Sequence, residues 1–177
     1  MTTKSPKILL TGLPGCGKTT AVKKIIAELD CAFVAGFYTE EIREGENRKG
    51  FRWKRLDGSE GILAHVAIKS RFNVGKYGVD IEGLEKNIVP ILDAGQSGAE
   101  LFVIDEIGKM ECLSEKFIAA VRRLFNSDSS ILATVAKKGS GLICEVKNYP
   151  GVESFNLTHE NRDKTIGKIL QILSFLK

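Results

Sequence analysis

The chain has 177 residues, of which 43% are hydrophobic and 27% charged, and its formal net charge is +4 at pH 7. These values are typical of one globular domain, which we expect over residues 1–177, and the mild positive charge favours an anionic ligand. The sequence has no apolar run long enough to span a membrane and no signal-peptide pattern, so we expect a cytoplasmic monomer with no membrane partner. Four singly placed cysteines and two histidines argue against a zinc site.

The first predicted elements flank a glycine-rich loop. An apolar run over residues 7–11 predicts a buried strand, and apolar residues at helical spacing over 21–29 predict a helix. The segment between them matches G-x-x-x-x-G-K-T, in which glycines let backbone amides turn toward a phosphate and the helix start adds its positive dipole end. The residues expected to bind nucleotide phosphates are Gly12, Leu13, Pro14, Gly15, Cys16, Gly17, Lys18, Thr19 and Thr20.

Side chains of this loop have separate expected roles. Lys18 places a cation on the β- and γ-phosphates, the Thr19 hydroxyl is a ligand of a Mg²⁺ cofactor, and Thr20 is a further donor. Cys16 leaves two interpretations open, because its oxidation could block nucleotide binding or it could be a small side chain with no redox role. We favour the second, since reactivity requires a lowered pKa, which the sequence does not show.

Strand and turn patterns dominate the next part of the chain. Residues 37–42 and 51–56 predict strands separated by a turn at 45–47, and 62–68 predicts a third strand. We therefore expect a small antiparallel insertion from about 37 to 70.

Basic and aromatic residues alternate over 48–55. Such a pattern fits a surface where rings stack on nucleic-acid bases, or a hairpin with one packed face and one solvated basic face. We favour the hairpin, because the stretch is short and the whole protein only mildly basic, so nucleic acid stays possible but not favoured.

The rest of the chain alternates helix and strand signals. Residues 74–80 are predicted to be a loop, and Pro90 is expected to kink or break the helix that follows. The order of elements predicts a three-layer α/β fold with a mostly parallel sheet and right-handed crossovers. Helices are expected after the N-caps Asp80, Ser114 and Thr158 and over 142–146, and strands over 101–104, 131–136 and 152–157.

A pair of acidic residues follows the apolar strand at 101–104. A strand that is apolar on both faces belongs in the middle of a parallel sheet, and such sheets place ligands at the carboxyl ends of their strands. Asp105 therefore fits the carboxylate that holds Mg²⁺ through water, and Glu106 is placed to orient or deprotonate an attacking water. Thr134 either senses the γ-phosphate or is satisfied within the sheet.

At Asp105–Glu111 the chain resembles the small P-loop nucleoside-triphosphatases first described from a hyperthermophile. The segments 36–43, 76–80 and 157–163 carry the same resemblance in the same order. It implies a RecA-like fold in which another strand lies between the two motif strands. It also implies slow Mg²⁺-dependent hydrolysis of several nucleoside triphosphates (ATP, GTP, CTP and UTP) to diphosphate and phosphate, with little base selectivity.

A cation over the γ-phosphate would accelerate hydrolysis further. Lys109 is the nearest candidate to Glu106 in sequence, and Arg43 and Arg162 are others, although each could equally lie in a surface salt bridge. Arg162 could instead bind the nucleotide by stacking on its base. Two other classes stay open: a kinase that transfers the γ-phosphate to a small acceptor, and a switch whose nucleotide state is read by a partner.

Overall fold

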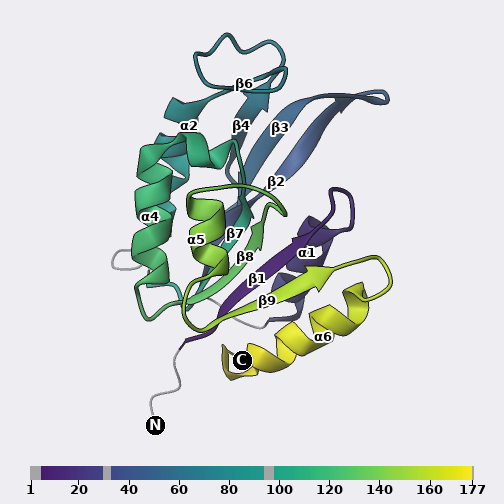
Figure 1. Cartoon of the computed structure of the whole chain (residues 1–177), viewed down its shortest axis with the longest axis vertical. Helices are drawn as coiled ribbons and strands as arrows, with labels where there is room; N and C mark the ends of the chain where they lie inside the picture. Colours follow the sequence, from purple (N-terminus) through teal and green to yellow (C-terminus); the bar gives the residue numbers. More distant parts are fainter. Residues whose placement is uncertain (1–4, 30–32, 94–97, 177) are drawn as a thin grey trace.

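A mixed sheet runs through the molecule in the order β5-β6-β4-β3-β2-β7-β8-β1-β9 (Figure 1). The computed structural model describes residues 5–29, 33–93 and 98–176. The described strands are β1 (Lys7–Gly12), β2 (Val34–Glu44), β3 (Asn47–Arg55), β4 (Glu60–His65), β5 (Asn73–Val74), β6 (Tyr77–Val79), β7 (Leu101–Ile107), β8 (Ser130–Val135) and β9 (Val152–Leu157). The described helices are α1 (Lys18–Glu28), α2 (Ile81–Asn87), α4 (Glu115–Phe125), α5 (Leu142–Lys147) and α6 (Arg162–Ile172), with the 3-10 helices η1 (Val89–Leu92), η2 (Glu111–Leu113) and η3 (Ser174–Leu176).

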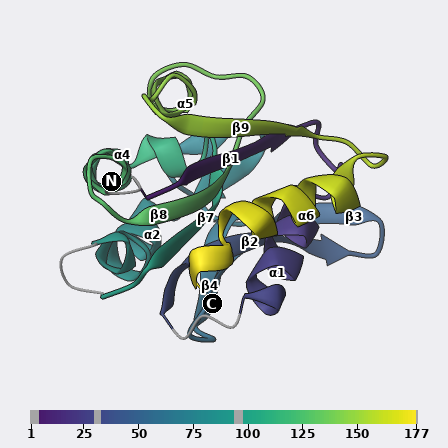
Figure 2. The same cartoon turned by 90° about the horizontal axis from the view of Figure 1, so that it is seen from below.

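The half of the sheet from β2 to β9 is parallel and is covered on both faces. Along β1, Ile8 and Leu10 pack with α1 and α6, whereas Leu9 packs into the core under α4 and α5. Figure 2 shows these helix pairs on opposite sides of the sheet. This is the predicted three-layer arrangement, and β8 lies between β1 and β7 as the resemblance implies.

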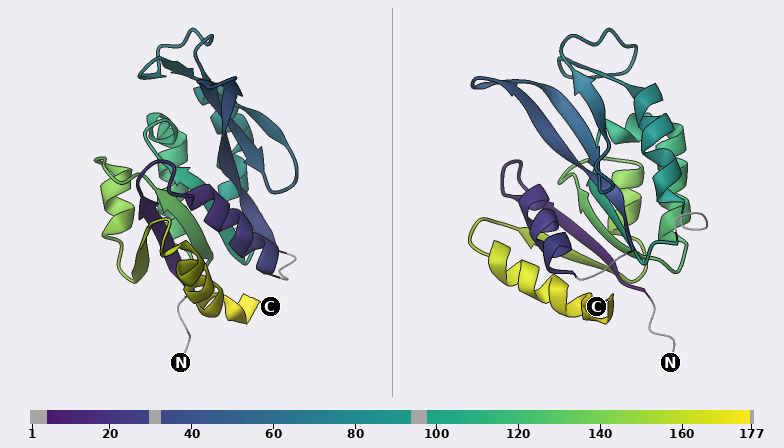
Figure 3. Two further views of the ribbon diagram at one scale, coloured as in Figure 1. Left: turned by 90° about the vertical axis from the view of Figure 1, so that its right-hand side faces the viewer. Right: turned by 180° about the vertical axis from the view of Figure 1, so that it is seen from behind.

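The other half of the sheet is an antiparallel extension, which we define as residues 39–79. β2 pairs with β7 in parallel up to Tyr38 and continues as the first strand of a hairpin with β3. β4, β6 and β5 complete the extension (Figure 3). β4 ends at His65 rather than near Ile68, because the Ile68 N–H bonds back to the His65 carbonyl at 3.2 Å and closes a turn.

The antiparallel part continues beyond residue 70, where the sequence pattern predicts a loop at 74–80. Instead, β5 and β6 form a short hairpin. Gly75 makes its turn with a φ of 58°, which glycine adopts readily. Gly78 lies so close to the chain that an added Cβ would come within 2.0 Å of the Ile68 carbonyl oxygen.

Helix starts follow the predicted caps in two of three cases. The Asp80 and Ser114 side chains accept hydrogen bonds from the N–H groups of Gly83 and Phe117. The α-helical pattern breaks before Pro90, which lies in the first turn of the 3-10 helix η1. Thr158 was expected to cap the last helix, but α6 begins at Arg162. The reason is a reciprocal pair: the Thr158 N–H donates to Asn161 Oδ1, and the Asn161 N–H donates to Thr158 Oγ1. Among the described residues, none of the helices has both the length and the apolar character to cross a membrane.

Candidate nucleotide-binding site

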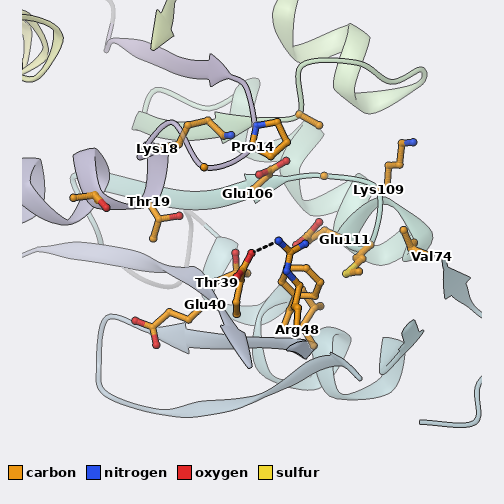
Figure 4. A pocket seen from close by; sticks show the side chains of 18 of the residues that line it. Pro14, Lys18, Thr19, Thr39, Glu40, Arg48, Val74, Glu106, Lys109 and Glu111 are labelled. Carbon is orange, nitrogen blue, oxygen red and sulfur yellow. Dashed lines mark ion pairs between the residues drawn. The ribbon is translucent and has the colours of Figure 1, made fainter. Parts of the chain in front are cut away.

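A cavity of about 750 Å³ separates the glycine-rich loop from the antiparallel extension (Figure 4). One wall is built by the loop and the start of α1, and the opposite wall by β2, β3 and β4. The segment after β7 closes it from one side. The lining residues are Pro14, Gly15, Gly17, Lys18, Thr19, Thr20, Thr39, Glu40, Glu41, Arg43, Arg48, Phe51, Leu63, Val74, Glu106, Gly108, Lys109, Met110, Glu111 and Ala136.

The loop leaves β1 and turns directly into α1. Gly15 and Gly17 have φ values of 78° and 92°, a region that other residues rarely adopt. Gly17 is the residue before the first turn of α1, so the unpaired amides of that turn lie beside the cavity. The Lys18 ammonium donates to the Gly12 carbonyl at 3.4 Å. This arrangement of amides, helix dipole and lysine suits a polyphosphate.

Asp105 joins the two predicted motifs in space. It lies near the carboxyl end of β7. Its Oδ2 accepts a hydrogen bond of 2.6 Å from the Thr19 hydroxyl on α1. Its Oδ1 accepts from Thr134 on β8 at 2.5 Å, so Thr134 is paired within the sheet. Burial raises the pKa of Asp105, while the hydrogen bonds from Thr134 and Thr19 oppose that shift.

These oxygens are compatible with a magnesium ion. Mg²⁺ takes oxygen ligands and keeps several waters, so it needs only one or two protein groups beside substrate phosphates. The Thr19 hydroxyl and the Asp105 carboxylate supply such oxygens next to the loop. In the part of the chain that the structure describes, no group of three acidic, histidine or cysteine side chains forms a metal cage.

Two carboxyl groups lie together beyond Asp105. Glu106 lines the cavity, and burial raises its pKa while the charge of Lys18 lowers it. Glu111 in η2 is fully buried, and this burial, with the negative charge of Glu106 next in importance, raises its pKa to about 8. A Cβ on Gly108 would lie 2.9 Å from Glu111 Oε2 and 3.3 Å from Glu106 Oε1, so a larger residue here would displace these two side chains.

The hairpin of β2 and β3 presents one packed face and one face of paired charges. Trp53 is buried against Gly61, where an added Cβ would lie 2.3 Å from the ring. Arg52 pairs with Glu60 at 3.3 Å, and Lys54 pairs with Glu40 at 3.1 Å. The hairpin therefore packs on the domain through its aromatic residues and neutralises much of its basic charge internally.

Several predicted site residues lie outside the cavity lining. Leu13 points to solvent, with 62% of its surface exposed, and Gly12 lies so close to the β9 end that a Cβ would touch the Leu157 carbonyl at 2.6 Å. Cys16 is buried beneath the loop. Asp105 lies behind Thr19. Arg162 packs on the back of the loop, where a Cβ on Gly17 would meet its Nη1 at 3.0 Å.

Two residues of the cavity were not singled out by the sequence argument. Glu111 belongs to the segment after β7, but spacing alone does not show that it folds back beside Glu106. Arg48 was part of the basic stretch and had no link to the glycine-rich loop. Only the sheet order, which places β3 two strands from β7, brings it to the cavity.

Known proteins are similar to this chain in sequence and in fold. The family described as NTPase matches residues 7–170. The nucleoside-triphosphatase THEP1 of Thermotoga maritima is 44% identical over 169 residues, which cover 96% of each chain. The human cancer-related nucleoside-triphosphatase is 39% identical over 178 residues, covering 92% of this chain and 94% of that protein. The crystal structure of THEP1 from Aquifex aeolicus superposes with a TM-score of 0.86 at 37% identity, covering 94% of this chain and 98% of that one. The match takes in the glycine-rich loop and the carboxylates of β7, and the chain therefore belongs to the NTPase family.

Proposed function

We propose that the protein hydrolyses nucleoside 5'-triphosphates to the diphosphate and phosphate with the help of Mg²⁺. The observation that carries this proposal is the 2.6 Å hydrogen bond between Thr19 and Asp105, which joins the phosphate-loop helix to the acidic end of β7. That contact supports the proposal because Thr19, the loop and the Glu106 carboxyl line one cavity, with Asp105 directly behind Thr19. The names of the relatives, which are nucleoside-triphosphatases, support the same reaction.

Each residue has one part in this mechanism. The loop amides and Lys18 bind the phosphates and stabilise the charge that develops on them. Thr19 and Asp105 hold the metal, which when bound neutralises charge on the β- and γ-phosphate oxygens. Glu106 orients the attacking water and accepts its proton. Its carboxyl group has no hydrogen-bond partner or ion pair among the described residues, so it is available to a water molecule.

We propose broad tolerance of the base and slow turnover. Arg162 packs beside Gly17 of the phosphate loop, outside the cavity lining, and its planar guanidinium is proposed to stack on any base that extends past the loop, because every base has a π-face. Slow turnover is supported by the ion pairs of the two arginines that line the cavity. Arg43 and Arg48 both form ion pairs with Glu41, and a cation that gives up such a pair to approach a phosphate offsets part of the rate gain.

The test measures phosphate release with Mg²⁺ and ATP, GTP, CTP or UTP, for the wild type and for Glu106→Gln. The variant keeps the size of the side chain and removes its ability to take a proton. Its turnover is expected to fall by about 100-fold or more, within the typical range of general-base contributions, with nucleotide affinity nearly unchanged. Omitting Mg²⁺ is expected to abolish release.

The matched control is Glu153→Gln, which changes an exposed glutamate on β9 far from the cavity and should keep wild-type turnover. Wild-type turnover in Glu106→Gln would remove this residue from the mechanism. Binding of nucleotide without release from any of the four would contradict hydrolysis itself.

Phosphotransfer is a second candidate, and the apolar part of the cavity lining favours it. The wall farthest from the loop carries apolar side chains from the extension and from the segment after β7, including Phe51, Leu63 and Met110. Phosphates and water do not need such a surface, whereas a small acceptor does. A kinase would consume ATP much faster with its acceptor than with water alone, which a screen of alcohols, nucleosides and nucleotides can reveal.

A further inference from the structure

The cavity wall that faces the phosphate loop carries two arginines from neighbouring strands. Arg43 on β2 and Arg48 on β3 are paired in register, so both side chains leave the hairpin on the cavity side. Glu41 lies between them. Its Oε2 is 2.6 Å from Arg43 Nη2, and its Oε1 is 2.6 Å from Arg48 Nη2. A dashed line at Arg48 in Figure 4 marks the second of these ion pairs.

The two arginines differ in how fully they are bonded. Arg43 also uses its Nε on Glu41 at 2.7 Å and its Nη1 on the Glu46 carbonyl at 3.1 Å, so all three of its nitrogens have partners. Arg48 bonds through Nη2 alone, and its buried Nε has no hydrogen-bond partner among the described residues. A guanidinium that keeps unused N–H donors beside a cavity can donate hydrogen bonds to an oxyanion bound there.

The direction of Arg48 places those donors opposite the phosphate loop. Its guanidinium carbon lies 5.4 Å from the centre of the Phe51 ring, a cation–π contact that favours this side of the hairpin. Figure 4 shows the side chain directed from β3 toward Glu111 and Glu106, with Pro14 and Lys18 beyond them. Arg48 and the loop thus face each other from opposite walls of one cavity.

The other candidate cations are placed differently. Lys109 is exposed, and Figure 4 shows it directed away from Glu106 and Arg48. Arg162 packs on the back of the loop and does not line the cavity. Lys18 reaches the phosphates from the loop side only. Arg48 is therefore the cation best placed to approach a γ-phosphate from the side that the loop leaves open.

We infer that Arg48 is a catalytic residue that donates hydrogen bonds to the γ-phosphate in the transition state, an arginine finger supplied by the protein's own antiparallel extension. This inference rests on the proposed hydrolysis. In that reaction water forms a bond to the γ-phosphorus, the bond to the β–γ bridging oxygen breaks, and the water proton passes to Glu106. Nucleoside diphosphate, phosphate and a proton leave. Arg48 exchanges Glu41 for the γ-phosphate oxygens as negative charge moves onto them.

The test compares wild type, Arg48→Ala, Arg48→Lys and the control Arg52→Ala at saturating Mg²⁺ and ATP. Arg52 lies on the same strand and pairs with Glu60 away from the cavity lining. Arg48→Ala is expected to lower kcat by about 100-fold or more, with KM within about threefold, since arginine fingers contribute ~10³–10⁵ in rate. Arg48→Lys keeps the charge but loses the fork of donors, so it is expected to recover only part of the rate. Arg52→Ala should match wild type.

A second readout separates chemistry from folding. ADP with Mg²⁺ and aluminium fluoride mimics the transferring phosphoryl group, and the wild type is expected to bind this combination more tightly than ADP alone. Arg48→Ala should lose that gain while it keeps its ADP affinity and its melting temperature. A purely structural role for Arg48 would lower all three measurements together.

Three results would overturn the inference. Wild-type kcat in Arg48→Ala would show that Glu106 and the loop act without it, and the proposed hydrolysis would stand. Equal losses in Arg48→Ala and Arg52→Ala would show a general effect of hairpin charge. Absence of phosphate release from the wild type would instead refute the proposed function, and the inference with it.

Discussion

The parallel half of the sheet and the antiparallel extension differ in how their strands are buried. The inner strands of the parallel half are buried on both faces, as in β8, where all six residues are buried. The extension buries mainly one face and covers the other with ion pairs such as that between Lys54 and Glu60. The first region holds the phosphate loop, and the second supplies the opposite wall of the cavity. Both are needed for the cavity, which neither region encloses alone.

The largest loss of stability on substitution is expected where the two regions join. Gly36 on β2 has a φ of 131°, and an added Cβ would lie 1.9 Å from the Val103 carbonyl oxygen of β7. Gly36→Ala therefore forces two backbones of one sheet apart. We expect a loss of about 4 kcal/mol or more in the free energy of unfolding, at the upper end of single substitutions. Urea unfolding of the purified variant measures it.

The control for that junction is Gly45→Ala in the hairpin turn of the extension. Gly45 also has a positive φ, of 57°, but nothing lies within 4 Å of an added Cβ. Only the backbone conformation is strained, so we expect a loss of about 1–2 kcal/mol. If the two variants lose equal stability, then close strand contact is not what distinguishes the junction from the extension.

A pH-dependent effect of intermediate size is expected at Glu111, where the cavity meets the parallel core. Below about pH 4.5 this carboxyl is protonated in the folded and the unfolded chain. Between that value and its folded pKa of about 8, only the unfolded chain releases the proton, so rising pH destabilises the folded protein. Glu111→Gln does not ionise. Its stability relative to wild type should therefore grow across this window, by about 4 kcal/mol.

Denaturant unfolding at pH 5 and pH 8 checks this expectation. Glu153→Gln is the matched control, because Glu153 is exposed on β9 and should give the same difference from wild type at both pH values. A pH-independent difference for Glu111→Gln would mean that its carboxyl ionises normally in the folded protein.

The smallest effect is expected at the ion pairs that link the two regions on the surface. Glu40 on β2 bonds Lys23 of α1 at 2.6 Å and Lys54 of β3 at 3.1 Å. The hydrogen bond from Lys23 lowers the pKa of Glu40. Partial burial opposes this shift, and the hydrogen bond from Lys54 adds to it. Glu40→Gln is expected to cost less than about 1 kcal/mol, because partly exposed pairs are screened by water and salt. Thermal melting at low and high salt should show the cost only at low salt; a cost that persists at high salt would contradict surface screening.

Local sequence was sufficient for much of the parallel half. The apolar runs that became β1, β7 and β8 and the caps at Asp80 and Ser114 depend on neighbours in the chain, so their patterns could be interpreted directly. The glycine-rich loop was equally clear, because its glycines are required by backbone geometry. The start of α6 was placed too early, since Thr158 and Asn161 bond each other in a turn that propensity alone does not distinguish from a cap.

The sequence by itself determined the phosphate loop, the acidic strand end and the alternation of helices and strands, because these features arise from short-range patterns of burial and backbone freedom. The tertiary structure alone decided which distant side chains share the cavity. Arg48 and Glu106 are far apart in the chain, and no local pattern relates them. They line one cavity because β2 pairs with β7 on one edge and with β3 on the other. Burial of Glu111, and hence its raised pKa, likewise exists only once the segment after β7 folds against the cavity.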